Sequence, residues 1–254
     1  MTNFSQFLPE TIYIIDDNQD TAGDIKDQVE DLGCKPILIT RGHFSTTSEL
    51  MEEIEPQNAG IICDHRLQHG SLADFFGSEF VALSYSQRLP ALLLTEYGEQ
   101  DVDTTIRRYR RNIPILLQRS NVDLKLIADG MIKCIEELKG NIETDRRPHR
   151  TFVKVTHIDR EGEDIVADVF IDSWKPKTAI RLPISLMGDD VADYVTSKLV
   201  RNADPPLSVR LLAKVNLGAS NSWELYFDEF EIPGEPRSSL ESLVTKKLYG
   251  KDIE

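Results

Sequence analysis

The stretch Ile-Tyr-Ile-Ile-Asp-Asp-Asn at residues 12–18 places two acids directly after four apolar residues. A short apolar run of this kind, followed by a turn, is typical of a strand that is buried on both faces of a parallel sheet. Similar apolar runs at residues 60–63 and 89–94 end at Asp64 and Thr95. The sequence therefore predicts several buried strands, each with a polar side chain at its end.

Helical periodicity fills the intervals between these runs. We expect strands at residues 12–15, 37–39, 60–63, 89–94 and 113–117, and helices at residues 25–32, 46–54, 72–83, 99–110 and 124–138. This alternation predicts an α/β domain with a parallel sheet covered by helices on both faces. Ligands bind such sheets beyond the carboxyl ends of the strands, so the acids should face a site.

The acids Asp16, Asp17 and Asp64 are the side chains best suited to chemistry there. Three carboxylates at neighbouring strand ends repel one another, and a hard divalent cation such as Mg²⁺ relieves that repulsion. A carboxylate beside the cation can then attack a phosphoryl donor, and the Thr95 hydroxyl could bind a phosphoryl oxygen. Each of these residues taken alone could instead be a helix cap or a turn residue.

These segments resemble the receiver domains of response regulators in two-component signalling. The run 12–18 resembles the opening strand and its acidic pair, residues 60–67 resemble the third strand with its phospho-acceptor, and residues 92–95 resemble the fourth strand with its switch residue. The resemblance covers a little over half of the chain and implies a flavodoxin-like, five-stranded parallel sheet. It also implies that Asp64 is the phospho-acceptor, that Thr95 senses the phosphoryl group, and that Asp16, Asp17 and Asp64 bind Mg²⁺. The implied partner is a histidine kinase or a phosphotransfer protein of a phosphorelay.

Three positions depart from the receiver pattern. The family places a Lys after the fifth strand, where this chain has Gln118 followed by Arg119. Arg119 could substitute for the Lys, although a planar guanidinium is not equivalent to an ammonium group. The family's aromatic switch position is Ile115, and the position of its common Pro is Gln68. Phosphorylation chemistry fits the sequence, whereas the usual switching relay does not.

Three functions remain open at this point. The first is a phosphorylated receiver that relays its state to the second half of the chain. The second is a pseudo-receiver that acts as a non-phosphorylated scaffold for protein interactions, which the loss of the Lys and the aromatic residue favours. The third is an Mg²⁺-dependent phosphatase or phosphotransfer enzyme built on the same acids. The chain has no Ser-His-Asp pattern, Gly-rich phosphate loop or dinucleotide fingerprint, so we expect a signalling protein rather than an enzyme.

The second half of the chain has a different pattern. The receiver-like domain should span residues 9–140 and a polar linker residues 141–150. Short alternating runs then predict a smaller, mainly-β barrel or sandwich over residues 151–234, with a turn at 159–163 and a strand at 223–230. Residues 235–254 should be a tail or a short helix.

Charge limits the partners of this protein. The formal net charge is -14, which argues against nucleic acid as a main ligand because phosphates must be neutralised by cations. The only dense basic run is Arg107–Arg111. In receivers this region belongs to the usual partner or dimer face, so the run could dock an acidic protein or a second copy of the chain. Alternatively, it only complements the dipole of the preceding helix.

Other features indicate a cytoplasmic protein. The first residues lack the basic and apolar segments of a secretory signal, and no apolar run approaches the length of a membrane helix. Cys34, Cys63 and Cys134 are scattered and lack metal-ligand spacing. We expect them to be reduced and mostly buried.

Overall fold

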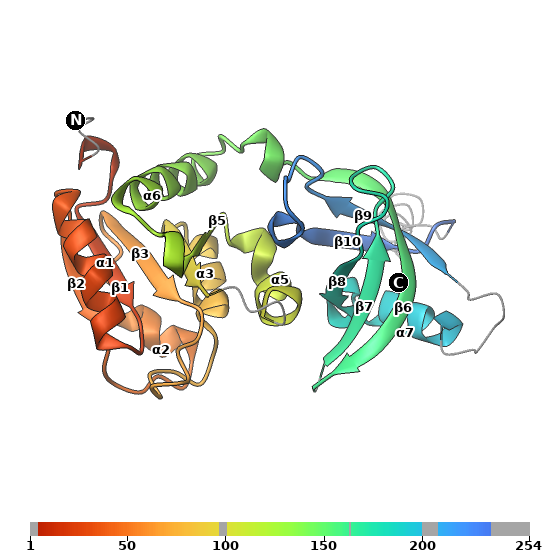
Figure 1. The fold of residues 1–254 in the computed structure, drawn as a ribbon, viewed down its shortest axis with the longest axis horizontal. Helices are drawn as coiled ribbons and strands as arrows, with labels where there is room; N and C mark the ends of the chain where they lie inside the picture. The colour runs from red at the N-terminus through yellow and green to blue at the C-terminus, as the bar shows by residue number, and fades with distance from the viewer. Residues whose placement is uncertain (1–4, 97–100, 163, 200–207, 235–254) are drawn as a thin grey trace, which may run out of the picture. The chain divides into compact units, whose positions relative to one another are not determined.

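A parallel sheet forms the centre of the N-terminal part of the chain (Figure 1). The structure is a computed structural model that describes residues 5–96, 101–162, 164–199 and 208–234. The strands of this sheet are β1 (Thr11–Ile15), β2 (Lys35–Ile39), β3 (Ala59–Asp64), β4 (Ala91–Thr95) and β5 (Ile115–Gln118). Their order is β2-β1-β3-β4-β5, and all pairs are parallel. This is the flavodoxin-like order, and the predicted fold class is confirmed.

Helices cover both faces of the sheet because successive strand residues point to opposite sides. Ile12 and Ile14 pack in one core with residues of α1 (Gln19–Asp31) and α6 (Leu124–Leu138). Tyr13 and Ile15 pack in the other core with residues of α2 (Thr47–Glu52) and α3 (Gly77–Ser86). The β1 run has no polar position because both of its faces are buried.

Two helices differ from the sequence prediction. The helix expected at residues 72–83 begins only at Gly77, because the backbone of Leu72 and Asp74 hydrogen-bonds to the backbone of Phe44 instead. The helix expected at residues 99–110 is irregular in its described part. It consists of a π-helical segment (Val102–Ile106), the short helix α5 (Arg107–Tyr109) and a 3₁₀ turn (Arg110–Asn112). π-Helical turns are rare in proteins, and those that occur often lie at functional sites.

The chain forms two compact units, and the first of them is made of two separate stretches of sequence. The first contains residues 1–147 and also residues 216–226, and the second contains the remaining residues from 148 onward. We call residues 216–226 the inserted segment, since they connect two strands of the second unit but belong to the first. The sequence pattern instead predicts these residues as part of the mainly-β domain over residues 151–234.

The second unit contains an antiparallel sheet. Its strands are β6 (His149–Glu161), β7 (Asp164–Phe170), β8 (Ile180–Pro183), β9 (Val209–Val215) and β10 (Phe227–Glu231), in the order β10-β9-β6-β7-β8. The helix α7 (Asp189–Leu199) packs against β6 and β9. The sheet is a half-barrel, so the smaller mainly-β domain is confirmed.

Local details in this half of the chain differ from the prediction. The first strand runs on to Glu161, so the turn expected at residues 159–163 begins later. Trp223 lies in a 3₁₀ turn (Ser222–Glu224) and is 38% exposed, and only Phe227–Glu231 forms the strand expected at residues 223–230. The tail or helix expected at residues 235–254 lies outside the described residues.

All three cysteines are buried free thiols, as predicted. Burial raises the pKa of Cys134 to about 12, so this thiol is neutral and unreactive at physiological pH. In the part of the chain that the structure describes, no helix has the length and apolar composition needed to cross a membrane.

Candidate functional site

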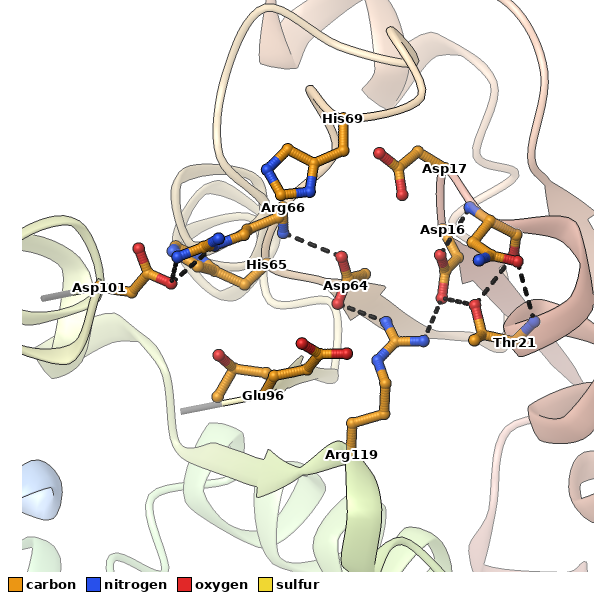
Figure 2. Close-up of a pocket in the computed structure, with 12 residues that line it drawn as sticks. Asp16, Asp17, Thr21, Asp64, His65, Arg66, His69, Glu96, Asp101 and Arg119 are labelled. Carbon is orange, nitrogen blue, oxygen red and sulfur yellow. Dashed lines mark hydrogen bonds and ion pairs between the residues drawn. The ribbon is translucent and has the colours of Figure 1, made fainter. Parts of the chain in front are cut away.

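The acids predicted from the sequence meet at the carboxyl edge of the parallel sheet. Asp16 and Asp17 follow β1, Asp64 is the last residue of β3, and Thr95 is the last residue of β4. Parallel register aligns these ends, since Ile15 lies opposite Cys63 and Asp64 opposite Leu94. A cavity of about 350 Å³ opens there and is lined by Asp16, Asp17, Asn18, Thr21, Asp64, His65, Arg66, His69, Thr95, Glu96, Asp101 and Arg119 (Figure 2).

Neither Asp16 nor Asp17 caps the helix that follows. The N-cap of α1 is Asn18, whose side chain accepts hydrogen bonds from the backbone N–H groups of Asp20 and Thr21. The Asp17 carboxylate accepts a hydrogen bond from the backbone N–H of Gly70 and lines the cavity. The capping alternative therefore does not account for the acidic pair.

Arg119, rather than Gln118, reaches the acids. Gln118 is the last residue of β5 and lies opposite Thr95, and its side chain accepts a hydrogen bond from Asn121 at 2.8 Å. Arg119 comes next, and its Nη1 lies 2.8 Å from Asp16 Oδ2 while its Nη2 pairs with Asp64 Oδ1. Burial alone would lower the pKa of Arg119, but the charges of Asp64 and Asp16 outweigh it and raise this pKa, so the group stays cationic.

The three acids have the chemistry of a divalent-cation site. One carboxylate oxygen from each of Asp16, Asp17 and Asp64 lies within 4.8 Å of the others. Mg²⁺ prefers carboxylate oxygens and is usually bound through one or two carboxylates together with several waters. The donor set therefore fits the cation that the sequence predicts.

Thr95 is 2% exposed and lines the cavity beside Glu96. Thr95 ends the strand next to that of Asp64. Asp64 lies opposite Leu94, the residue before Thr95. The backbone N–H of His65 also donates to the Leu94 carbonyl at 2.9 Å, which fixes the end of β3 against β4. Thr95 thus lies at the carboxyl edge of the sheet, as the sequence predicts.

The two residues after Asp64 connect the site to the π-helical segment. His65 is 1% exposed, stacks on Phe76 with ring centroids 5.1 Å apart, and its Nε2 lies 3.0 Å from Thr105 Oγ1. Burial lowers the pKa of His65 to about 4, so the ring is neutral near pH 7. The guanidinium of Arg66 pairs at 2.7 Å with Asp101, the residue just before the π-helical segment (Figure 2).

The basic run Arg107–Arg111 is divided between the interior and the surface. Arg107 and Arg110 are buried, whereas Arg108 and Arg111 are exposed. Nη1 of Arg107 donates to two carbonyls of the inserted segment, Ser222 O and Leu225 O, each at 2.7 Å. Nε of Arg110 donates to Trp223 O at 3.0 Å. Two arginines of this run therefore bind a segment of their own chain.

Arg146 completes the attachment of the inserted segment. Its guanidinium pairs with Glu137 of α6 and lies 5.0 Å above the ring centre of Tyr226. The Tyr226 hydroxyl donates to the Arg146 carbonyl at 2.7 Å. Asn216, 1% exposed, donates to the carbonyls of Asp145 and Glu224 and accepts from the Tyr226 N–H. The polar groups at both ends of the segment are thus paired within the first unit.

Sequence reasoning missed the residues that depend on tertiary contact. Asp101 and Thr105 carried no signal, since their partners Arg66 and His65 lie far away in the sequence. The acceptors of Arg107 are backbone carbonyls, which every residue type supplies, so no motif marks them. By contrast, the sequence marks the strand-end acids, because Asp16 and Asp64 directly follow apolar runs and Asp17 follows Asp16.

No family model matches this chain, and no curated protein matches it. Among solved structures, it is similar to the response regulator StyR, with 15% identity and a TM-score of 0.39, over 52% of this chain and 62% of that one. A response-regulator receiver domain protein from Clostridium thermocellum gives 16% identity and a TM-score of 0.40, over 51% and 96% of the two chains. The signal receiver domain of a modulated diguanylate cyclase from Desulfovibrio desulfuricans G20 gives 21% and 0.41, over 52% and 97%.

These similarities cover about half of this chain, and the chain spans less than two thirds of StyR. The strand order and the parallel pairing establish the fold without them. The first unit has the flavodoxin-like fold that receiver domains share.

Proposed function

We propose that this protein is a cytoplasmic signalling protein of a two-component system, and that its first unit is a receiver that accepts a phosphoryl group on Asp64. The observation that carries the proposal is the meeting of Asp16, Asp17 and Asp64 with a cationic Arg119 at one edge of a flavodoxin-like sheet. The donor would be a phosphohistidine on a histidine kinase or a phosphotransfer protein.

The proposed reaction is an in-line transfer. A carboxylate oxygen of Asp64 attacks phosphorus, a new P–O bond forms, and the P–N bond to the donor imidazole breaks, so the imidazole leaves with the electron pair. Mg²⁺ held by Asp16, Asp17 and Asp64 would neutralise charge on the transferring group. The hydroxyl of Thr95 would bind a phosphoryl oxygen, and the Arg119 fork would bind another. The side chain of Gln118 bonds to Asn121 instead, so we assign the role of the missing Lys to Arg119.

We further propose that the state of Asp64 reaches the second unit through the π-helical segment. His65 and Arg66 tie the acceptor loop to Thr105 and Asp101. The same irregular helix continues into Arg107, whose guanidinium holds the inserted segment. A change in the loop after Asp64 would therefore shift the anchor of residues 216–226, which join β9 to β10. This route replaces the aromatic switch, whose position is Ile115 in this chain.

Binding of a phosphoryl mimic tests the proposal. Beryllofluoride with Mg²⁺ should raise the melting temperature of the full chain by about 5 °C, because a ligand of the folded state stabilises it by mass action. Asp64→Ala should show no shift. Asp20→Asn removes an acid of the first turn of α1 that does not line the cavity, and it should keep the full shift. Scanning calorimetry or thermal fluorescence measures all three.

A pseudo-receiver is the second candidate, and one observation favours it. Arg119 already neutralises Asp16 and Asp64 without any metal, so the acids can be kept as a structural ion pair. In that case the receiver fold is a docking scaffold for another protein. The wild-type chain would then show no thermal shift with beryllofluoride and Mg²⁺, as Asp64→Ala does.

A further inference from the structure

The guanidinium of Arg119 lies between the carboxylates of Asp16 and Asp64 (Figure 2). All three side chains are largely enclosed, with exposed fractions of 16% for Arg119, 4% for Asp16 and 12% for Asp64. An ion pair of this kind is screened less by solvent than a surface pair. Arg119 therefore places a permanent positive charge between two of the three expected metal ligands.

Both oxygens of Asp16 already accept hydrogen bonds. Oδ1 accepts from the backbone N–H of Asn18 at 2.9 Å. Oδ2 accepts from the Thr21 hydroxyl at 3.0 Å and from Arg119 at 2.8 Å. A metal ion that binds Asp16 must share or replace one of these donors, and a cation and a guanidinium repel each other at the same oxygen.

Asp64 is engaged in the same way. Oδ2 accepts from the backbone N–H of Arg66 at 2.9 Å, and Oδ1 accepts from Arg119. The donors to Oδ2 of Asp64 and Oδ1 of Asp16 are backbone groups held by local turns, so they cannot leave without a change in the main chain. Arg119 is the donor shared by the two acids, and a side chain can rotate away.

The three carboxylates outnumber the guanidinium of Arg119, so the cluster can still attract a metal ion. Asp17 belongs to the same cluster but pairs with the backbone N–H of Gly70, not with Arg119. Three carboxylates and one guanidinium leave the cluster with an excess of negative charge. This excess would attract a divalent ion to the cavity, where Arg119 already pairs with two of the three acids that would hold it.

We propose that Arg119 is a built-in counter-ion that competes with the divalent cation for Asp16 and Asp64, so that it sets the metal affinity of the site. This inference rests on the proposed metal site and adds the residue that controls it. A cation held by Asp16 and Asp64 would take the place of the guanidinium at these two acids. The displaced guanidinium, with its planar pair of donors, then becomes available to a phosphoryl oxygen.

Replacement of Arg119 by an uncharged residue therefore strengthens metal binding. Arg119→Gln should bind Mn²⁺ on the order of tenfold more tightly than the wild-type chain, because a charged competitor is lost from an enclosed site. Arg66→Gln is the matched control. It removes a guanidinium that lines the same cavity but pairs with Asp101, so the affinity should change by less than about threefold.

A Mn²⁺ titration of the full chain, followed by electron paramagnetic resonance of the free ion, gives the affinities. Thermal melting gives an independent result: Arg119→Gln should melt lower than wild type without metal and should gain more from Mn²⁺. Arg119→Lys keeps the positive charge but loses the planar pair of N–H donors, so its Mn²⁺ affinity should lie between those of wild type and Arg119→Gln. It replaces Arg119→Gln if that variant does not fold.

The possible results separate this inference from the proposed function. Equal or weaker Mn²⁺ binding by Arg119→Gln, at a measurable wild-type affinity, would overturn the role of Arg119 and leave the metal site intact. Binding by Arg119→Gln with no detectable binding by wild type would support the competition in its strongest form. Absence of binding in all variants up to millimolar Mn²⁺ would overturn the metal site itself, and with it this inference.

Discussion

Arg107→Ala should lower the free energy of unfolding of the first unit by about 3 kcal/mol, because it removes two short charge-assisted hydrogen bonds from a buried guanidinium. Arg107 is 2% exposed, and burial lowers its pKa. The substitution would leave the carbonyls of Ser222 and Leu225 without their donor and would open a cavity where the guanidinium lay.

The control for this prediction lies in the same basic run. Arg108 is exposed, and Arg108→Ala should change stability by less than about 0.5 kcal/mol. The chain has two tryptophans, of which Trp223 lies in the inserted segment and Trp174 in the second unit. Urea unfolding followed by fluorescence in a Trp174→Phe background therefore reports on the first unit. Equal losses for both variants would contradict the anchoring role of Arg107.

The same pair of variants tests the proposed route to the second unit. Beryllofluoride with Mg²⁺ should change amide hydrogen exchange in residues 216–226 of the wild-type chain and of Arg108→Ala. Arg107→Ala should lose this response while it still binds the mimic at Asp64, because the anchor between the irregular helix and the inserted segment is gone. A response preserved in Arg107→Ala would show that the signal takes another route.

Gly77→Ala should destabilise the first unit by about 3 kcal/mol or more, because an added methyl group at this tightly packed site forces the backbone to shift. A Cβ atom at Gly77 would stand 1.8 Å from the backbone oxygen of Asp64. The neighbouring N–H of Gly77 donates to His65 O at 2.8 Å, so the helix start cannot move away without loss of that bond. The main chain at the acceptor would shift, and beryllofluoride binding should fall with it.

Gly23→Ala is the matched control for Gly77→Ala. Gly23 lies in α1, and a Cβ atom there meets nothing within 4 Å. Alanine favours a helix over glycine by about 1 kcal/mol, so this variant should be slightly more stable than wild type. Urea midpoints of the two variants give the comparison. Similar midpoints would mean that the approach of Gly77 to Asp64 is not the constraint described here.

The sequence predicted the parts of the fold that rest on local pattern. The run 12–15 is apolar at every position because both faces of its strand are buried, and Asp16 and Asp17 mark its end. The same logic located Asp64 and Thr95. The choice between Gln118 and Arg119 required the structure, since a shift of one residue at the end of a strand exchanges the two side chains.

The sequence could not predict how the inserted segment joins the first unit. Residues 216–226 follow a strand that alternates as a half-buried β-strand should, and their acceptors for Arg107 are main-chain oxygens. The run Arg107–Arg111 looked like a surface patch because composition does not show which side chains point inward. Trp223 lies in a 3₁₀ turn rather than in the expected strand, because the capping box of Asn221 and Glu224 stabilises the turn in competition with strand formation.

Intact-mass spectrometry of the full chain after incubation with Mg²⁺ and acetyl phosphate tests the central claim most directly. We expect a single phosphoryl adduct in the wild-type chain and in Asp20→Asn, and no adduct in Asp64→Ala. Wild-type protein that stays unmodified after prolonged exposure, while it still binds Mn²⁺, would contradict the account of Asp64 as a phospho-acceptor and leave the pseudo-receiver scaffold as the function of this fold.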